Sequence, residues 1–187
     1  METFSQRMDR AFVLFMAVSF WGWLAETLFF WACYGRFCDR GLLTLPFCTI
    51  YGCAFLLTDL LLGTPGCRED GLLRRVKRGH HPLAVYAAVS AGLVTLLELG
   101  TGALCHALLG LRLWDYSAYR FHFHGYICLE YTLLWACLLP PCMRYLFPPL
   151  KERVSALPLP WLRGLAGTLA LAAATDWGMS ILRLSGG

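Results

Sequence analysis

Five long apolar segments constrain the fold of this 187-residue chain more than any other feature of its sequence. They cover about 11–34, 47–63, 83–111, 125–147 and 161–182. A helix needs about 20 mainly apolar residues to cross the hydrocarbon core of a bilayer. Because lipid offers the backbone no hydrogen bonds, such segments cross a membrane as helices. We therefore expect an all-α fold, a polytopic membrane helical bundle with about five transmembrane helices, in a single transmembrane domain over 1–187.

The composition agrees with a bilayer protein. The chain is 58% hydrophobic and 15% charged, whereas roughly a quarter of the residues of a soluble protein are charged. A soluble domain of this length lacks the interior to bury so much apolar surface, and disorder requires the opposite composition. Seven tryptophans suit the membrane interface, where indole rings concentrate.

The fourth and fifth apolar segments each contain a pattern that predicts helix geometry. Pro140 and Pro141 should kink the fourth segment or end it early. The fifth segment carries a ladder of small residues that would let another helix approach closely, although small residues on a lipid-facing helix would give the same pattern. The ladder consists of Ala166, Ala170, Ala174 and Gly178.

The distribution of lysine and arginine predicts the orientation, because cytoplasmic loops carry an excess of both. The N-terminal side of the bundle holds 11 of them: Arg7, Arg10, Arg68, Arg74, Arg75, Lys77, Arg78, Arg144, Lys151, Arg153 and Arg163. The opposite side holds 5: Arg36, Arg40, Arg112, Arg120 and Arg183. We therefore expect a cytoplasmic N-terminus and outer loops at about 35–46 and 112–124.

Five acidic residues fall inside the apolar segments: Glu26, Asp59, Glu98, Glu130 and Asp176. An ionisable group in a span costs at least about 2.5–3.5 kcal/mol, so such groups mark functional sites by default. Glu26 continues a small-polar stripe with Ser19 and Gly22, and Glu98 lies on another with Thr95 and Gly102. Each stripe should face protein or water. It would either line a polar pocket between the first and third helices, open to the outside, or consist of protonated acids that hydrogen-bond neighbouring helices.

The second outer loop contains two local patterns. Asp115 stands two residues before Ser117, which favours an Asx turn. Phe121 to His124 alternate aromatic and histidine side chains, as in a short extended piece. His122 and His124 could ligate a metal, but two histidines at this spacing without cysteine leave the metal unknown.

Several further motifs carry a resemblance to a known family. They are Gly22-Trp23-Leu24-Ala25-Glu26, Asp39-Arg40-Gly41-Leu42-Leu43, Pro46-Phe47-Cys48-Thr49-Ile50-Tyr51-Gly52, Glu98 with Thr101-Gly102, and Trp114-Asp115-Tyr116-Ser117 continuing to Phe121, Phe123 and Gly125-Tyr126-Ile127-Cys128-Leu129-Glu130. Through these motifs, over about 20–145, the chain resembles the bacterial family called "putative ABC-transporter type IV" (CmpB-like). The chain departs from the family pattern at Asp39, Thr49 and His122 or His124. The resemblance implies a permease-like transport protein, multi-pass in a bacterial cell membrane.

We expect a transport or solute-binding component with an outward-facing acidic pocket. The expected substrate-binding residues are Glu26, Arg40, Glu98, Asp115 and Arg120, and the pocket lining is Trp23, Tyr51, Thr101, Trp114, Tyr116, His122, His124 and Glu130. Arg40 and Arg120 would pair with outer carboxylates or with an anionic head group. The chain carries no G-x-x-x-x-G-K-[ST] phosphate loop, so an ATP-driven role requires a separate ATPase or another membrane subunit. No cofactor is expected.

Two alternatives stay open. The first is an accessory or scaffold protein whose polar residues only fix helix packing. The second, and weaker, is a membrane-embedded enzyme that modifies lipids, with Glu26 or Glu98 as general base and His106, His122 or His124 as partner. The chain has neither G-x-S-x-G nor H-E-x-x-H, so we favour a protein without enzymatic activity. The lipid bilayer is the expected partner, and the sequence leaves open whether the chain forms a homo-oligomer. Because the basic residues are scattered, we expect no binding to nucleic acid.

Overall fold

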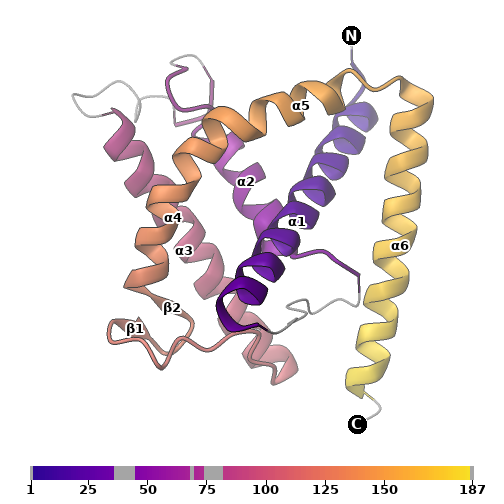
Figure 1. Cartoon of the computed structure of the whole chain (residues 1–187). Helices are drawn as coiled ribbons and strands as arrows, with labels where there is room; N and C mark the ends of the chain where they lie inside the picture. Colours follow the sequence, from indigo (N-terminus) through magenta and orange to yellow (C-terminus); the bar gives the residue numbers. More distant parts are fainter. Residues whose placement is uncertain (1, 36–44, 68–69, 74–81, 186–187) are drawn as a thin grey trace. The chain divides into compact units, whose positions relative to one another are not determined.

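The computed structural model describes residues 2–35, 45–67, 70–73 and 82–185, which are mainly helical (Figure 1). In chain order the elements are α1 (Phe4–Tyr34), α2 (Thr49–Leu61), α3 (Pro82–Leu109), β1 (His122–Phe123), β2 (Ile127–Cys128), α4 (Leu129–Pro141), the π-helix η2 (Cys142–Leu146), α5 (Phe147–Ser155) and α6 (Leu159–Ser185). The all-α prediction is confirmed, because β1 and β2 are only two residues each. The chain forms two compact units, Met1–Leu56 with Leu150–Gly187, and Leu57–Pro149.

The helices that could cross a membrane are fewer than the five apolar segments. In the described residues, Phe4–Cys33 and Pro82–Leu109 are long and apolar enough by length and composition. A third span is reached if Leu129–Ser155 and Leu159–Ser180, a pair with a sharp bend between its members, counts as one. The segment 47–63 contains only the 13-residue α2, which is shorter than the roughly 20 residues that a crossing requires.

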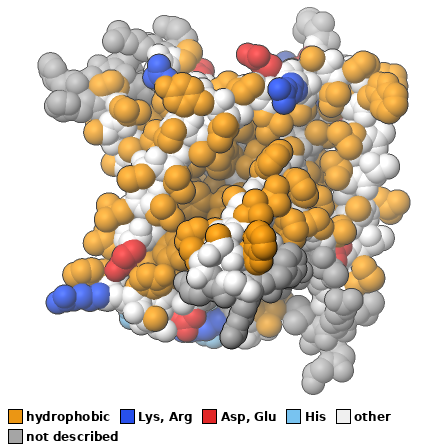
Figure 2. Space-filling view, in the orientation of Figure 1, with side chains coloured by type: hydrophobic (Ala, Val, Ile, Leu, Met, Phe, Trp, Pro, Cys, Tyr) orange, Lys and Arg blue, Asp and Glu red, His pale blue; other side chains and the backbone are white. Residues whose placement is uncertain are grey.

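Large hydrophobic side chains are exposed along the long helices. Trp21, Phe29 and Trp31 of α1 and Leu96 and Leu108 of α3 all have more than half of their surface accessible. Figure 2 shows hydrophobic side chains over most of the visible face and few charged ones. Exposed apolar surface of this extent is unusual for a soluble monomer and is expected where lipid is the solvent. The chain is a membrane protein.

The first unit is built around α1 and α6, which lie side by side (Figure 1). Its hydrophobic core contains Val13 and Leu14 of α1, Val154 of α5, and Leu162 and Ala166 of α6. Because Leu162 and Ala166 are four residues apart, they lie on one face of α6. This apolar stripe holds α5 and α6 against the N-terminal half of α1.

The start of α2 packs closely on α1 within the same unit. The backbone N–H of Cys48 donates to the carbonyl of Ser19 at 3.0 Å. A Cβ on Gly52 would lie 2.7 Å from the carbonyl oxygen of Phe15, and a Cβ on Gly22 would overlap the Tyr51 ring. Two glycines, one on each helix, therefore allow this close approach.

The buried face of α6 differs from the predicted small-residue ladder. Ala166 is buried, but Ala170, Ala174 and Gly178 are exposed. The buried positions in the second half of the helix are Asp176 and Ser180. The small residues of the ladder thus mainly occupy the exposed side of α6, in agreement with the second interpretation of that pattern.

The second unit contains α3 packed on α4, with the β1–β2 hairpin between them in sequence. Pro140 and Pro141 were expected to kink the fourth apolar segment or to end its helix early. The helical chain does not end there: α4 is followed directly by η2 and α5. Proline has no N–H to donate, and the N–H of Cys142 contacts the carbonyls of both Leu138 and Leu139. A π-helical turn therefore follows the two prolines. Prolines and π-helical turns are both common causes of kinks in helices.

The predicted extended piece at 121–124 is confirmed as strand β1. It pairs antiparallel with β2 in the register His122 with Cys128 and Phe123 with Ile127. The turn between them has positive φ at His124 (51°) and Gly125 (76°), as in tight hairpins. The hairpin joins the loop after α3 directly to the first turn of α4.

We predict that Gly52→Ala destabilises the protein by about 1–3 kcal/mol, the usual cost of overpacking, because the new methyl group meets the backbone of Phe15. The matched control is Gly178→Ala in α6, where a Cβ has nothing within 4 Å; it should be neutral or stabilising. Thermal unfolding of the purified proteins in detergent measures both. Equal melting temperatures for the two variants would contradict the close approach of α1 and α2.

Candidate functional site

Glu26 lies in the first unit and accepts a hydrogen bond from an aromatic hydroxyl. The Tyr51 Oη donates to Glu26 Oε1 at 3.1 Å, and the Tyr51 ring covers Gly22 one turn earlier on α1. Ser19, at the start of the same stripe, is fully buried. The predicted stripe of Ser19, Gly22 and Glu26 therefore faces protein, and its partner is the first turn of α2.

Glu98 lies in the second unit and is held by a tryptophan. The indole Nε1 of Trp135 on α4 donates to Glu98 Oε1 at 3.0 Å, and Glu98 is only 5% exposed. One turn away, the hydroxyls of Thr95 and Thr132 are 2.9 Å apart. These two contacts form a polar ladder between α3 and α4, so this stripe also faces protein.

The same face of α3 continues beneath the loop that precedes β1. A Cβ on Gly102 would lie 3.1 Å from the Tyr126 ring and 3.3 Å from the Trp114 ring. The Trp114 Nε1 donates to the carbonyl of Tyr126 at 2.7 Å, and the Tyr126 hydroxyl lies 2.7 Å from His106 Nδ1. Gly102 thus leaves space for the two rings that fix the loop on the end of α3.

Asp115 organises the loop as its spacing to Ser117 predicts. Its Oδ1 accepts the backbone N–H of Ser117 at 2.9 Å, which confirms the Asx turn, and its Oδ2 pairs with Arg112 at 3.1 Å. The hydrogen bonds from the Ser117 backbone and hydroxyl, followed by the Arg112 charge, hold the pKa of Asp115 below its ordinary value. Asp115 is exposed.

Two further predicted residues belong to an aromatic group on the loop. Tyr116 stacks on Tyr131 of α4 with ring centroids 4.7 Å apart, and Tyr119 meets both rings edge-on. The Arg120 guanidinium lies 5.5 Å above the Phe121 ring and is exposed. A cation held over an aromatic face keeps its hydrogen-bond donors available for an anion.

The two histidines of the loop differ in their contacts. His122 Nδ1 accepts the backbone N–H of Gly125 at 3.1 Å, which places the proton of the neutral ring on Nε2. His124 is exposed, with its ring edge-on to Phe123. Among the described residues, no three His, Cys, Asp or Glu side chains are grouped closely enough to hold a metal ion.

The remaining acids have different environments. Glu130 is exposed in the first turn of α4, where a negative charge is favourable to the helix dipole. Asp176 is 1% exposed and accepts the backbone N–H of Leu45 at 2.9 Å. Its carboxylate thereby fixes the chain that enters α2.

The predicted site residues are distributed over the two units. Glu26, Trp23 and Tyr51 lie in the first; the acids Glu98, Asp115 and Glu130, together with Thr101, Trp114, Tyr116, Arg120, His122 and His124, lie in the second. Arg40 lies outside the described residues. A common pocket for Glu26 and Glu98 stays a prediction.

Sequence reasoning missed three partners of the predicted site residues: Trp135, Thr132 and Arg112. Trp135 and Thr132 are three residues apart, as are Glu98 and Thr95, and this matched spacing could have revealed the ladder. Arg112 stands three residues before Asp115, a spacing that also suits an ion pair.

We predict that Trp135→Phe lowers stability by about 1–3 kcal/mol, because it removes an N–H donor from a buried carboxyl group. The control is Trp161→Phe on α6, since Trp161 is 75% exposed. Thermal unfolding of both variants provides the comparison. A loss no larger than that of the control would show that the Trp135–Glu98 hydrogen bond contributes nothing to stability.

A second prediction concerns pH. The carboxylate of Asp115 stabilises the loop at pH values above its ordinary pKa of 3.8, and this stabilisation disappears as the pH falls through the lowered folded-state pKa. Ser117→Ala removes the hydroxyl donor and should raise the pKa of Asp115. An NMR titration of the carboxyl carbon measures the change. Ser155→Ala, at the end of α5, should leave the titration unchanged, and an unmoved curve for Ser117→Ala would contradict the assignment.

Comparison with known proteins adds the family. Residues 13–181 match the model of the family described as "Putative ABC-transporter type IV". No curated protein and no solved structure matches the chain. The matched region extends over most of both compact units and contains every candidate site residue. The chain therefore belongs to the family described as "Putative ABC-transporter type IV", which confirms the resemblance.

Proposed function

We propose that this protein is a multi-pass component of a transport system in a bacterial cell membrane, permease-like, and that it binds a cation or a small polar molecule on acidic side chains. The family match supports a role related to transport. The binding site rests on the intramembrane acids and on the outer loop.

Glu98 is the observation that carries this proposal. It is almost fully buried, and it lies on α3, one of the helices long enough to cross a membrane. Keeping an ionisable group at such a position costs at least about 2.5–3.5 kcal/mol on insertion scales. A glutamine would accept the same indole hydrogen bond from Trp135 at a lower cost. A carboxyl group is therefore best explained by a function that uses its charge.

Glu26, in the first unit, is the second acid of the proposal. Tyr51 orients its carboxyl group from the side, and Gly22 provides the space for the Tyr51 ring. Asp115 and Arg120 on the outer loop would make the first contacts with the substrate from the aqueous side, and Arg40 would contribute from the other outer loop.

Transport driven by ATP requires a second protein in this proposal. The chain has no phosphate-binding loop of the Walker type, so a separate ATPase, or another membrane subunit that recruits one, would supply the energy. The polar segments 64–82 and 148–160 are the expected docking regions.

The accessory or scaffold function is the second candidate, and one observation favours it. The polar stripes of α1 and α3 are engaged in hydrogen bonds between helices: Tyr51 with Glu26, Trp135 with Glu98, and Thr95 with Thr132. Such bonds stabilise packing in a membrane by about 0.6–2 kcal/mol each. In a scaffold, the acids would be protonated and replaceable by glutamine.

We predict that Glu26→Gln and Glu98→Gln each abolish the binding of a cationic ligand while leaving folding intact, because glutamine preserves the hydrogen-bond acceptor and removes the charge. The measurement is the shift of the melting temperature on addition of sodium, calcium or tetramethylammonium chloride. Glu152→Gln, on the exposed face of α5, is the charge-matched control. A ligand-induced shift that survives both glutamine variants would favour the scaffold.

A further inference from the structure

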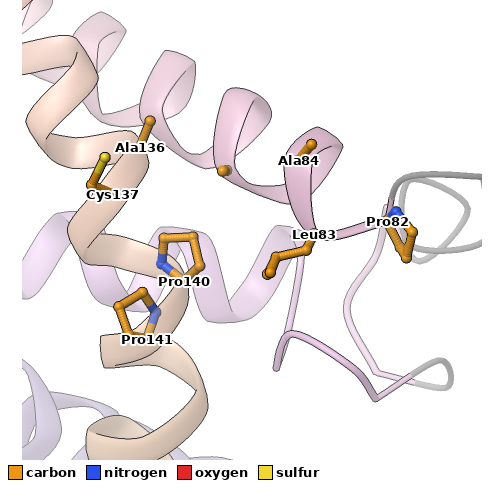
Figure 3. Close-up of a pocket in the computed structure, with 8 residues that line it drawn as sticks. Pro82, Leu83, Ala84, Ala136, Cys137, Pro140 and Pro141 are labelled. Carbon is orange, nitrogen blue, oxygen red and sulfur yellow. The ribbon is translucent and has the colours of Figure 1, made fainter.

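An apolar hollow of about 600 Å³ lies in the second unit, between the first turns of α3 and the last turns of α4 (Figure 3). Its lining consists of Pro82, Leu83, Ala84, Ala87, Ala136, Cys137, Pro140 and Pro141. The volume falls in the range of ligand pockets, about 300–1,000 Å³. None of the acids of the candidate functional site lines it.

The sequence explains why this space is open. Three of the lining residues are alanines, whose methyl groups leave room between the two helices. Pro140 and Pro141 occupy the last turn before η2, and a π-helical turn is wider than an α-helical one. Among the described residues, the wall is therefore apolar and shaped by the backbone, and none of its lining side chains carries a charge or a hydroxyl group.

A positive charge stands next to the hollow along α4. Arg144 follows Pro140 by four residues and Pro141 by three, which places it about one turn further on the same side. Its guanidinium group lies against Gly66 and 5.6 Å from the Tyr145 ring centroid. Among the described side chains, no carboxylate forms an ion pair with Arg144.

The first turn of α3 makes the same end of the hollow more positive. Pro82 and Leu83 belong to this turn, and its unpaired N–H groups carry a partial positive charge. The apolar wall matches an acyl chain, and its charged end matches a phosphate.

We propose that this hollow binds one acyl chain of an anionic phospholipid, with the lipid phosphate on Arg144 and the first turn of α3. The site is separate from the proposed transport pocket and does not depend on it. A lipid held there would fill the gap between α3 and α4 and fix the distorted end of α4.

Native mass spectrometry of the full-length purified protein tests this proposal, with dioleoylphosphatidylglycerol and dioleoylphosphatidylcholine as probes. The unmodified protein should retain one phosphatidylglycerol in preference to phosphatidylcholine. Arg144→Gln should weaken the binding of phosphatidylglycerol about fivefold, the effect of one basic side chain at an anionic surface, and leave phosphatidylcholine unchanged. Arg153→Gln, an equal loss of charge on the exposed face of α5, should leave the preference intact.

A second pair of variants tests the hollow itself. Ala136→Leu fills it from α4 and should reduce the retention of both lipids, whereas Ala170→Leu on the exposed face of α6 should reduce neither. If Ala136→Leu fails to fold, Ala84→Leu fills the space from α3. Equal retention of the two lipids by the unmodified protein overturns the proposal. So does retention by the filled variant equal to that of Ala170→Leu.

Discussion

The hydrogen bond between Trp135 and Glu98 is the interaction on which the second unit depends most. A carboxyl group in the apolar part of a helix bundle is unfavourable unless a neighbouring helix offers it a donor. The indole N–H provides that donor at 3.0 Å, and the threonine pair one turn away repeats the connection. Together the two contacts fix which faces of α3 and α4 meet. Apolar side chains alone would specify this pairing poorly, because lipid is as apolar as they are.

The first unit satisfies the same constraint with different residues. Tyr51 donates to Glu26, and Asp176 accepts from the backbone that leads into α2. In both units an acid on a long helix is met by a donor from another segment, and glycines provide the space for the rings. The acids therefore have structural partners, and the proposed substrate would have to compete with these contacts or use the remaining lone pairs of the carboxylates.

Sequence periodicity predicted some parts of this structure well. The stripes of α1 and α3, the Asx turn at Asp115 and the extended piece at His122 follow from local spacing, and all are present. The buried face of α6 did not follow, because alanine and glycine fit a lipid-facing surface as well as a helix contact. The π-helical turn after Pro141 could not be predicted either. It forms only because the helix continues past two prolines, and tertiary packing determines whether a helix does so. Trp135 was missed because a tryptophan in an apolar segment is equally consistent with a side chain that faces lipid. Only the structure shows that its indole N–H donates to Glu98.

The central claim is that Glu98 binds a ligand through the charge of its carboxyl group. Calorimetric titration of the purified protein with sodium, calcium or tetramethylammonium chloride tests it most directly, with Glu98→Gln beside the unmodified protein and Glu152→Gln, on the exposed face of α5, as the charge-matched control. The account predicts that Glu98→Gln loses the binding and that Glu152→Gln keeps it. Binding of unchanged affinity in Glu98→Gln would contradict the claim.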